Sequence, residues 1–370
     1  MRQLYLAATG QNRGKTTAAL GLLNGFIASG LRTGFLKPVG QRTVMEDGQP
    51  ADEDAVLMKE AFGLPESYAL MSPVHIPRGF TRSFIAGDVV EDLPARIHAA
   101  HRSYAAHDVL LIEGTGHAGV GAVIDLSNAV VARMLAAPAI VISEGGIGRP
   151  IDEIVLNAAL FTAHGVPVAG AIVNKVDAEA LVPLSRTLER GLARHDIPLL
   201  GTLPRRPILS NPTLEMILEG VRGDLVHPGP DLDLVIGGVA IGAMEPQHVL
   251  QGLRPGSLVI MPGDREDLIE LIVEAQPRPS IPGAPDRRVI GLVLTGGYIP
   301  RQSVLQSIRS ADLFAALVGD ETYDVASDVH DLLVKTHAAD REKIEMIKRL
   351  VADHLDIDRI LDVAVEVSPA

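Results

Sequence analysis

The stretch that most constrains this fold is residues 9–16, TGQNRGKT, between an apolar run at residues 4–8 and a helical pattern at residues 17–27. It matches the phosphate-binding pattern G-x-x-x-x-G-K-[S/T], except that Thr9 replaces the first glycine. In such a loop, the backbone N–H groups and the N-terminus of the following helix attract phosphate. The order of strand, loop and helix therefore predicts a nucleotide site rather than a plain turn.

The positions of this loop have separate expected roles. Lys15 is expected to reach the β and γ phosphates, and the Thr16 hydroxyl to bind Mg²⁺. The nucleotide is expected to be ATP, with GTP as the alternative. The expected nucleotide-binding positions of the loop are Thr9, Gly10, Gln11, Asn12, Arg13, Gly14, Lys15, Thr16 and Thr17.

The composition excludes several classes of function. Of the 370 residues, 33 are Lys or Arg and 46 are Asp or Glu, and the net charge of −13 argues against a broad nucleic-acid surface. The chain has no cysteine, which excludes disulfides, thiolate metal sites and cysteine nucleophiles. No apolar segment approaches about 18 continuous residues, the length of a membrane span. We expect a cytoplasmic protein with neither nucleic-acid nor membrane partners.

Apolar runs alternate with helix-period segments through the first 220 residues. The expected strands are 4–8, 33–39, 109–112, 139–142, 166–173 and 199–203, and the expected helices are 17–27, 93–104, 126–135, 151–163 and 178–194. This alternation predicts an α/β fold: a three-layer P-loop NTPase domain with a parallel sheet covered on both faces. Ligands of such sheets bind at the carboxyl ends of the strands.

A second domain is expected after the cluster of Gly and Pro at residues 222–230, which gives domains 1–222 and 223–370. It is expected to be a smaller α/β unit that ends in an amphipathic helix. The expected strands are 232–236, 257–261, 289–294 and 313–318, the expected helices are 267–275, 302–308, 324–335 and 340–354, and the proline-rich residues 276–286 are expected to form a surface loop.

Two carboxylates are candidates for a metal site. Glu113 ends the apolar run 109–112, and a buried strand ending in Glu is uncommon unless the charge has a partner. A role in binding Mg²⁺ or a catalytic water is therefore favoured over a solvated strand end. Asp54 lies in an acidic run at a helix start, where it either complements the helix dipole or completes the Mg²⁺ shell with Thr16 and Glu113.

Lys37 ends the second strand, directly before Pro38. It either meets the γ-phosphate or an anionic substrate, or is a solvated surface lysine.

Residues 174–177 match N-K-x-D, the pattern by which many GTPases read guanine. Asn174 and Lys175 are expected to contact the base, without a choice between guanine and adenine. The alternative is a turn followed by a helix cap. The G-x-G-x-x-G at 114–119 is interpreted as a flexible turn rather than a dinucleotide site, because the first strand and helix already carry a triphosphate loop.

Residues 1–220 resemble dethiobiotin synthetase and the ATP-dependent cobyrinic acid amidotransferases. The resemblance rests on the loop 9–17, on Lys37 with Pro38 and Val39, and on Asp54, Glu113 with Gly114, and Asn174. It implies that Lys15 and Thr16 bind phosphate and Mg²⁺, that Asp54 and Glu113 complete the metal site, that Lys37 faces the substrate and that Asn174 reads the base. The loop start, Ala8 to Gln11, departs from the G-T-D-T usual in dethiobiotin synthetases.

The remainder resembles the DRTGG domain, through residues 263–265 and 294–297. Together the two parts resemble the noncatalytic N-terminal region of long phosphotransacetylases. This resemblance implies a regulatory role, a homodimer and a phosphotransacetylase catalytic partner. The second domain is then either a site for a small effector, a self-association surface or a salt-bridged turn.

Three hypotheses for the function remain open. The first is a regulatory protein that binds nucleotide and Mg²⁺. The second is an ATPase or an ATP-dependent C–N ligase that activates a small anionic substrate, related to cobyrinic acid a,c-diamide synthase, with Lys15, Lys37 and Glu113 as catalytic residues. The third is a GTP switch that acts through residues 174–177.

Overall fold

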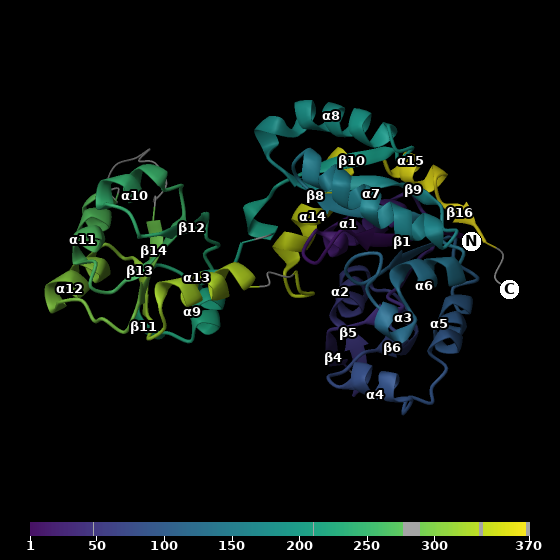
Figure 1. Ribbon diagram of the computed structural model, residues 1–370, viewed down its shortest axis with the longest axis horizontal. Helices are drawn as coiled ribbons and strands as arrows, with labels where there is room; N and C mark the ends of the chain where they lie inside the picture. The colour runs from purple at the N-terminus through teal and green to yellow at the C-terminus, as the bar shows by residue number, and fades with distance from the viewer. Residues whose placement is uncertain (47, 210, 277–288, 333–335, 368–370) are drawn as a thin grey trace. The chain divides into compact units, whose positions relative to one another are not determined.

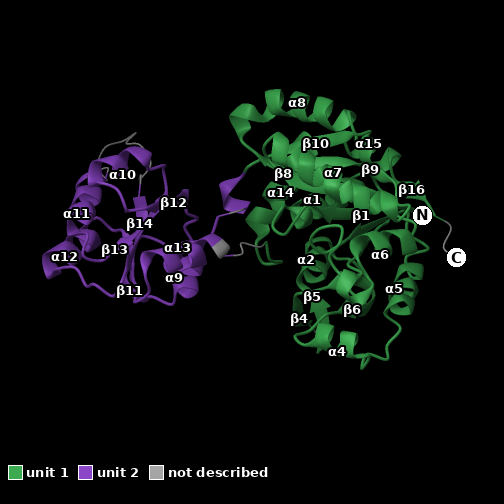
Figure 2. Ribbon diagram, viewed as in Figure 1, with its two compact units in different colours: residues 1–205, 336–370 green, residues 206–335 purple. Residues whose placement is uncertain are grey.

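The structure, a computed structural model, describes residues 1–46, 48–209, 211–276, 289–332 and 336–367. It divides into two compact units (Figures 1 and 2). Unit 1 is Met1–Arg205 together with Thr336–Ala370, and unit 2 is Arg206–Lys335. No helix within the described ranges is long and apolar enough to cross a membrane.

The described strands of unit 1 build a seven-stranded sheet in the order β10-β9-β8-β1-β7-β2, with β16 also paired to β1. The strands on that path pair in parallel, whereas β16 is antiparallel to β1. The parallel α/β fold expected from the sequence is thereby confirmed, and the carboxyl ends of the parallel strands meet at one edge. The bounds are β1 Arg2–Ala8, β2 Thr33–Leu36, β7 Val109–Glu113, β8 Ala139–Glu144, β9 Val168–Val176, β10 Leu199–Pro204 and β16 Val365–Glu366.

Helices cover both faces of this sheet. On one face, buried side chains of four helices form one apolar cluster with Tyr5 and Ala7 of β1. Leu4 and Leu6 alternate with these residues, so they point to the opposite face, where α1 contacts β1 and β2 and also packs against α14. The bounds are α1 Lys15–Ala28 and α14 Arg341–His354, and on the other face α5 Leu93–Arg102, α6 Asn128–Met134, α7 Gly148–Ala163 and α8 Leu181–Ala193.

The chain between β2 and β7 forms a small lobe over the carboxyl edge of the sheet. Two short strand pairs, β3 with β6 and β4 with β5, lie beside the start of α2. The helix α2 begins at Glu53, and Asp52 caps it by accepting a hydrogen bond from the Asp54 backbone N–H. The bounds are β3 Val39–Gly40, β4 Thr43–Glu46, β5 Gln49–Asp52, α2 Glu53–Phe62, α3 Tyr68–Met71, β6 Val74–His75 and α4 Phe80–Ala86.

The C-terminal segment packs onto unit 1, which differs from the expected division into residues 1–222 and 223–370. Its elements are α14, α15 (Ile357–Asp362) and β16. Glycines of α1 make this contact close: an added Cβ would lie 2.2 Å from Val351 at Gly21 and 2.7 Å from Ile357 at Gly25. The segment therefore covers the helix that follows the phosphate-binding loop.

The described strands of unit 2 form a five-stranded sheet in the order β11-β15-β14-β13-β12, in which β11 alone is antiparallel to its neighbour. Separate apolar clusters lie on its two faces. The bounds are β11 Asp224–Pro228, β12 Gly238–Ile241, β13 Ser257–Pro262, β14 Val289–Thr295, β15 Phe314–Leu317, α9 Leu214–Val221, α10 Pro246–Gly252, α11 Glu266–Glu274, α12 Gln302–Ser310 and α13 Thr322–Asp331.

The start of unit 2 lies before residue 222, because α9 buries Leu214, Ile217 and Val221 in the core of its sheet. The strand expected at residues 232–236 is wrong. Its backbone instead pairs with the segment around α9, with Leu214 N donating to Leu234 O at 3.1 Å. The expected surface loop lies outside the described residues from 277 onward.

Candidate functional site

The phosphate-binding loop joins β1 to α1 at the carboxyl edge of the sheet. The backbone N–H of Thr9 donates to Ile142 O of β8 at 2.8 Å, and the loop ends at Gly14, which has a φ of 89°. An added Cβ at Gly14 would lie 1.8 Å from Asn174 Nδ2. Both the left-handed backbone and the close approach therefore require glycine at this position.

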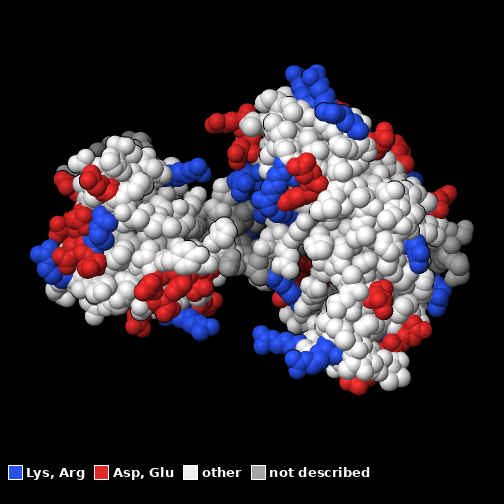
Figure 3. All heavy atoms as spheres, viewed as in Figure 1, with Lys and Arg blue, Asp and Glu red and all other residues white. Residues whose placement is uncertain are grey.

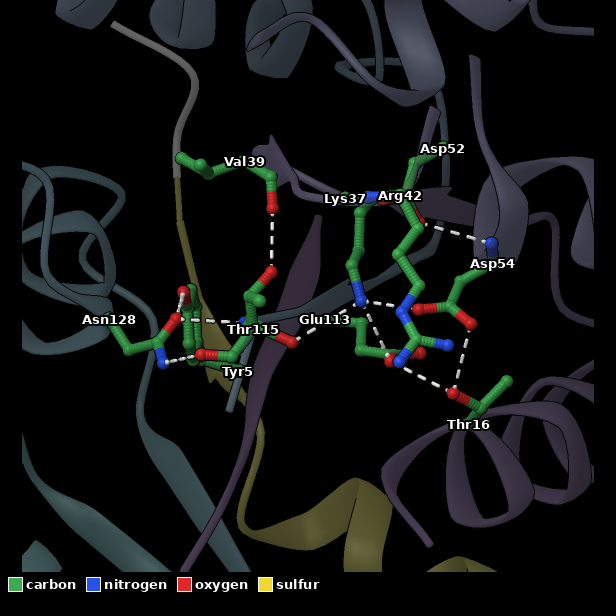
Figure 4. A network of polar contacts seen from close by, with 11 residues as sticks. Tyr5, Thr16, Lys37, Val39, Arg42, Asp52, Asp54, Glu113, Thr115 and Asn128 are labelled. Carbon is green, nitrogen blue, oxygen red and sulfur yellow. Dashed lines mark hydrogen bonds and ion pairs between the residues drawn. The ribbon is translucent and has the colours of Figure 1, made fainter. Parts of the chain in front are cut away.

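Four side chains meet where α1 begins, as Figure 4 shows. Thr16 Oγ1 lies 3.1 Å from Asp54 Oδ1 and 3.2 Å from Glu113 Oε1. Lys37 Nζ donates to Asp54 Oδ2 at 2.5 Å and to Glu113 Oε1 at 3.0 Å. The structure thus brings together the candidate residues from four separate segments of the sequence.

Burial sets the electrostatics of this centre. Lys37 is 3% exposed and Glu113 is 0% exposed, which rules out a solvated surface lysine and a solvated strand end. Burial alone would lower the pKa of Lys37, but the carboxylates of Asp54 and Glu113 raise it well above its usual value. Burial raises the pKa of Glu113 to about 7, although the Lys37 ammonium opposes this shift. Each of these buried charges is therefore stabilised by the opposite charge beside it.

The donor set fits a Mg²⁺ ion that also binds phosphate. Glu113 Oε2 is buried without a hydrogen-bond partner among the described residues, so a carboxylate oxygen remains for another ligand. Thr16, Asp54 and Glu113 offer the hydroxyl and carboxylate oxygens that Mg²⁺ prefers. In the described part of the chain, no group of three or more His, Cys, Asp or Glu could hold a metal. A magnesium ion here would need further oxygens, from phosphate and water.

Asn174 and Lys175 contact the loop itself. Asn174 Nδ2 donates to Arg13 O at 3.2 Å, and its Oδ1 accepts from the Lys175 backbone N–H at 2.8 Å. Lys175 has a φ of 56°, and its Nζ donates to Asn12 O at 2.6 Å. Asp177 is an exposed residue whose carboxylate lies 3.5 Å from Arg205 Nε. The contacts made by the first two residues hold the backbone of the phosphate-binding loop.

Of the other side chains of the loop, some bind glutamates of neighbouring elements and some are exposed to solvent. Arg13 forms an ion pair with Glu144 at the end of β8 and lies 3.6 Å from Glu153 of α7. The hydroxyl of Thr9 donates to Glu153 at 2.9 Å. Sequence reasoning missed Glu153, whereas Glu144 opens a glycine-rich turn after an apolar strand, in the same position as Glu113. Residues 11 and 12 are exposed, and residues 10 and 14–17 are partly buried.

Of two further residues of the lobe, Arg42 was missed, whereas Asp52 belongs to the acidic run that was considered for the Mg²⁺ shell. Asp52 is 3% exposed, and its carboxylate also accepts from the Arg42 backbone N–H at 3.4 Å. In Figure 4 the Arg42 side chain points toward Thr16 and Glu113. Arg42 follows the Lys37 strand by five residues, and nothing in that spacing signals where its side chain lies.

A buried network supports the turn after Glu113. Asn128 Oδ1 accepts from the Tyr5 hydroxyl at 2.8 Å, and Asn128 Nδ2 donates to Thr115 O at 2.7 Å. The hydroxyl of Thr115 donates to Val39 O at 2.7 Å, which ties the turn to the lobe (Figure 4). The glycine-rich turn at residues 114–119 is therefore held in place by polar contacts. The interpretation of these residues as a flexible turn did not predict these contacts.

A cavity of about 60 Å³ lies beside this network. Its walls combine aliphatic side chains with hydroxyl and amide groups, and include Val39, Ile76, Thr81, Thr115 and Ile124. Val39 and Thr115 each follow a residue of the charged centre, Lys37 and Glu113, by two positions. The cavity has no charged side chain in its lining.

In unit 2, the turn containing Arg265 is a salt-bridged turn. The guanidinium binds Asp267, with Nε to Oδ1 at 2.9 Å, and donates to Gly242 O at 2.9 Å. The neighbouring Thr295 is buried, and its hydroxyl lies 2.7 Å from the Thr322 hydroxyl. Of the alternatives left open by the sequence, these contacts support the structural one.

Charge on the visible surface is mixed. On the face drawn in Figure 3, small groups of Lys and Arg are interspersed with Asp and Glu, and uncharged residues cover most of the area. No continuous basic surface is seen among the described residues on this face.

Two family models match the chain. The model described as AAA domain matches residues 2–213, and the DRTGG domain matches residues 216–332. The junction between the matches falls close to the start of unit 2 at residue 206.

The curated relatives include phosphate acetyltransferases from several bacteria. That of Pseudomonas aeruginosa is 26% identical over 97% of this chain and 51% of its own length. The enzyme of Pseudomonas putida is 28% identical over 96% of this chain and 51% of its own length. The enzyme of Synechocystis is 25% identical over 97% of this chain and 51% of its own length. The chain spans about half the length of the curated relatives it matches.

Two solved structures match parts of the chain at low similarity. The septum site-determining protein MinD complexed with Mg-ADP, from Pyrococcus horikoshii, is 15% identical over 56% of this chain and 83% of its own, with a TM-score of 0.33. The CBS and DRTGG domains of Clostridium perfringens pyrophosphatase, complexed with diadenosine tetraphosphate, are 16% identical over 38% of this chain and 60% of their own, with a TM-score of 0.28.

Proposed function

The chain belongs to the AAA-domain family, and from that premise we propose that unit 1 binds a purine nucleoside triphosphate together with Mg²⁺ and that unit 2 regulates the response to it. The observation that carries the proposal is the meeting of Thr16, Asp54, Glu113 and Lys37 at the start of α1. The phosphate-binding loop ends at Gly14, directly before Lys15, the first residue of α1. Carboxylates, a hydroxyl and an ammonium placed at a helix N-terminus are suited to a magnesium triphosphate.

In the proposed complex, the backbone of residues 9–14 and the first N–H groups of α1 receive the phosphates. Lys15 neutralises their charge, while Thr16, Asp54 and Glu113 hold the metal. Asn174 and Lys175 position the loop, so their effect on affinity is the same for adenine and guanine nucleotides. A bound Mg²⁺ ion would supply charge neutralisation between the phosphates.

Calorimetric titration of ATP and GTP, with and without Mg²⁺, tests the proposal. The wild type is expected to bind in the presence of Mg²⁺, and Lys15→Ala to bind at least about tenfold more weakly, because charge-assisted bonds to phosphate are lost. Lys348→Ala is the matched control, because Lys348 pairs with Glu345 on α14 at 2.7 Å. Equal affinity of wild type and Lys15→Ala would remove the loop from the function.

Regulation of an acetyltransferase is the corresponding proposal for the whole chain. It is supported by the curated phosphate acetyltransferases that match along nearly all of this chain. The test is to add the purified chain, with and without Mg-ATP, to a phosphate acetyltransferase catalytic domain and to follow acetyl phosphate formation. A rate unaffected by the chain under both conditions would reject this partner. Sedimentation of the same chain tests the expected homodimer.

A second candidate function is supported by the cavity whose lining includes Val39 and Thr115. Its aliphatic walls and uncharged polar groups suit the body of a small organic substrate whose anionic end reaches Lys37. The chain would then be an ATP-dependent ligase or ATPase, with Lys15 and the metal stabilising the phosphoryl group in transfer. Release of ADP stimulated by a diamine or a diacid, and lost in Glu113→Gln, would support it. No stimulation across such a panel would leave the regulatory function.

A further inference from the structure

The ammonium of Lys37 lies among the oxygen atoms that the proposed function assigns to a divalent cation. Glu113 Oε1 accepts from Lys37 Nζ at 3.0 Å and from the Thr16 hydroxyl at 3.2 Å. The two Asp54 oxygens are divided in the same way, with Oδ2 on Lys37 at 2.5 Å and Oδ1 on Thr16 at 3.1 Å. The carbonyl of Gly114 lies 3.4 Å from the same ammonium. The lysine thus takes the coordination position of a cation.

We propose that Lys37 is a built-in competitor of the divalent cation, which keeps the carboxylate pair closed to metal alone and opens it only to metal that arrives with phosphate. The inference rests on the proposed metal site of Thr16, Asp54 and Glu113. It assigns to Lys37 a selectivity role in metal entry, in addition to any contact with substrate.

Charge and space make the two cations mutually exclusive. Mg²⁺ binds oxygen at about 2.0–2.1 Å with near-octahedral geometry, so an ion that binds both carboxylates closely competes with the ammonium for Glu113 Oε1 and Asp54 Oδ2, although Glu113 Oε2 has no partner among the described residues. The ammonium at 2.5 and 3.0 Å from them occupies that space, and two positive ions at such a distance repel strongly in a buried site. Lys37 in this position therefore opposes the binding of a divalent cation by both carboxylates.

Phosphate supplies what the displaced lysine needs. Lys37 is 3% exposed, so its ammonium cannot leave the carboxylates for water without a change of the surrounding lobe. An unpaired buried ammonium is costly, so a new anionic partner must be available nearby. A nucleotide on the adjacent loop would provide that partner and would also give the metal its missing oxygens. Without phosphate, the described residues around the ammonium offer the metal two carboxylates, the Thr16 hydroxyl and the carbonyl of Gly114.

Binding of Mn²⁺ alone, followed by electron paramagnetic resonance of free Mn²⁺, tests the proposal in the full chain without nucleotide. The wild type is expected to bind weakly, and Lys37→Met at least about tenfold more tightly, because the competing charge is removed. Lys37→Arg keeps a cation in the site and is expected to stay closed. Lys343→Met is the matched control, because it removes a half-buried lysine that pairs with Asp340 at 3.4 Å outside the site.

Thermal unfolding with and without Mn²⁺ keeps the test decisive if Lys37→Met is unstable. The variant removes the ammonium from beside two buried carboxylates, so its melting temperature is expected to fall and to be raised by Mn²⁺, whereas that of the wild type is unchanged. Equal Mn²⁺ binding by wild type and Lys37→Met would overturn the proposal, as would the absence of binding and of thermal rescue in the variant. Failure of the nucleotide function is seen separately, as a lack of Mg-ATP binding by the wild type.

Discussion

Replacing Gly14 by alanine places a methyl group on the side chain of Asn174. The added Cβ would lie 1.8 Å from Asn174 Nδ2, and the backbone φ of 89° is one that residues with a side chain rarely adopt. Left-handed backbone costs a non-glycine residue roughly 1–2 kcal/mol, and forcing extra volume into a packed site costs about 1–3 kcal/mol. We therefore expect Gly14→Ala to destabilise the loop by about 2–5 kcal/mol.

The second substitution removes the collision but not the backbone strain. Asn174→Ala by itself loses the hydrogen bond from Nδ2 to Arg13 O at 3.2 Å, which is worth about 1 kcal/mol. The Cβ of residue 174 is 3.7 Å from the added methyl group, an ordinary contact distance. In the double variant, Gly14→Ala should therefore cost only about 1–2 kcal/mol, so the two changes are coupled by about 1–3 kcal/mol.

Hydrogen exchange measured by mass spectrometry on peptides from β1 and α1 provides the assay. It reports local stability, which is needed because the two units need not unfold together. A parallel titration with Mg-ATP and Mg-GTP shows whether the coupling extends to nucleotide affinity. An equal cost of Gly14→Ala in both backgrounds, within about 0.5 kcal/mol, would refute the packing argument. Selective loss of one base in Asn174→Ala would instead support base reading.

Three further outcomes are expected. Truncation of residues 336–370 should raise the protease sensitivity of α1 by at least about tenfold relative to Val351→Ala. The truncation uncovers the whole face of α1, whereas Val351→Ala removes only the two methyl groups of Val351. Equal sensitivity of the two variants would contradict the close packing. Burial raises the pKa of Glu113 from 4.5 to about 7. The free energy of unfolding of the metal-free protein should therefore fall as the pH rises through that interval, with a slope of at most about 1.4 kcal/mol per pH unit. Urea unfolding of Glu113→Gln at the same pH values should lack this fall. Asp177→Asn should leave the ratio of ATP to GTP affinity unchanged, because the Asp177 side chain is 82% exposed, and a shift in that ratio would revive the GTP switch.

Local signals were strong enough to predict the site edge. Glu113 follows an apolar strand and Lys37 follows another, and the parallel alternation of strands and helices requires their carboxyl ends to lie together. The same reasoning reached Thr16, which the loop pattern identifies by itself. The structure confirms that these elements form a parallel sheet, and it brings the side chains into direct contact.

The failures of sequence reasoning have a common physical cause, which is packing between distant segments. Residues 340–354 are amphipathic, but amphipathicity indicates only that one face is buried, without saying against which core. Their docking on α1 depends on Gly21 and Gly25, which permit close approach. The strand expected at residues 232–236 was wrong for a similar reason, because its apolar residues pack against the core of unit 2 while its backbone pairs with the segment beside α9.

The sequence alone therefore determined the class of fold, the phosphate-binding loop and the set of charged residues near it, because each depends on short-range pattern and on the geometry shared by all parallel sheets. Tertiary structure decided what those charges do in the absence of ligand. Only the folded chain places the Lys37 ammonium between Asp54 and Glu113 and turns Asn174 onto Arg13 O. Ion pairing and hydrogen bonding act over about 3 Å, and only tertiary packing brings segments so distant in the sequence within that range.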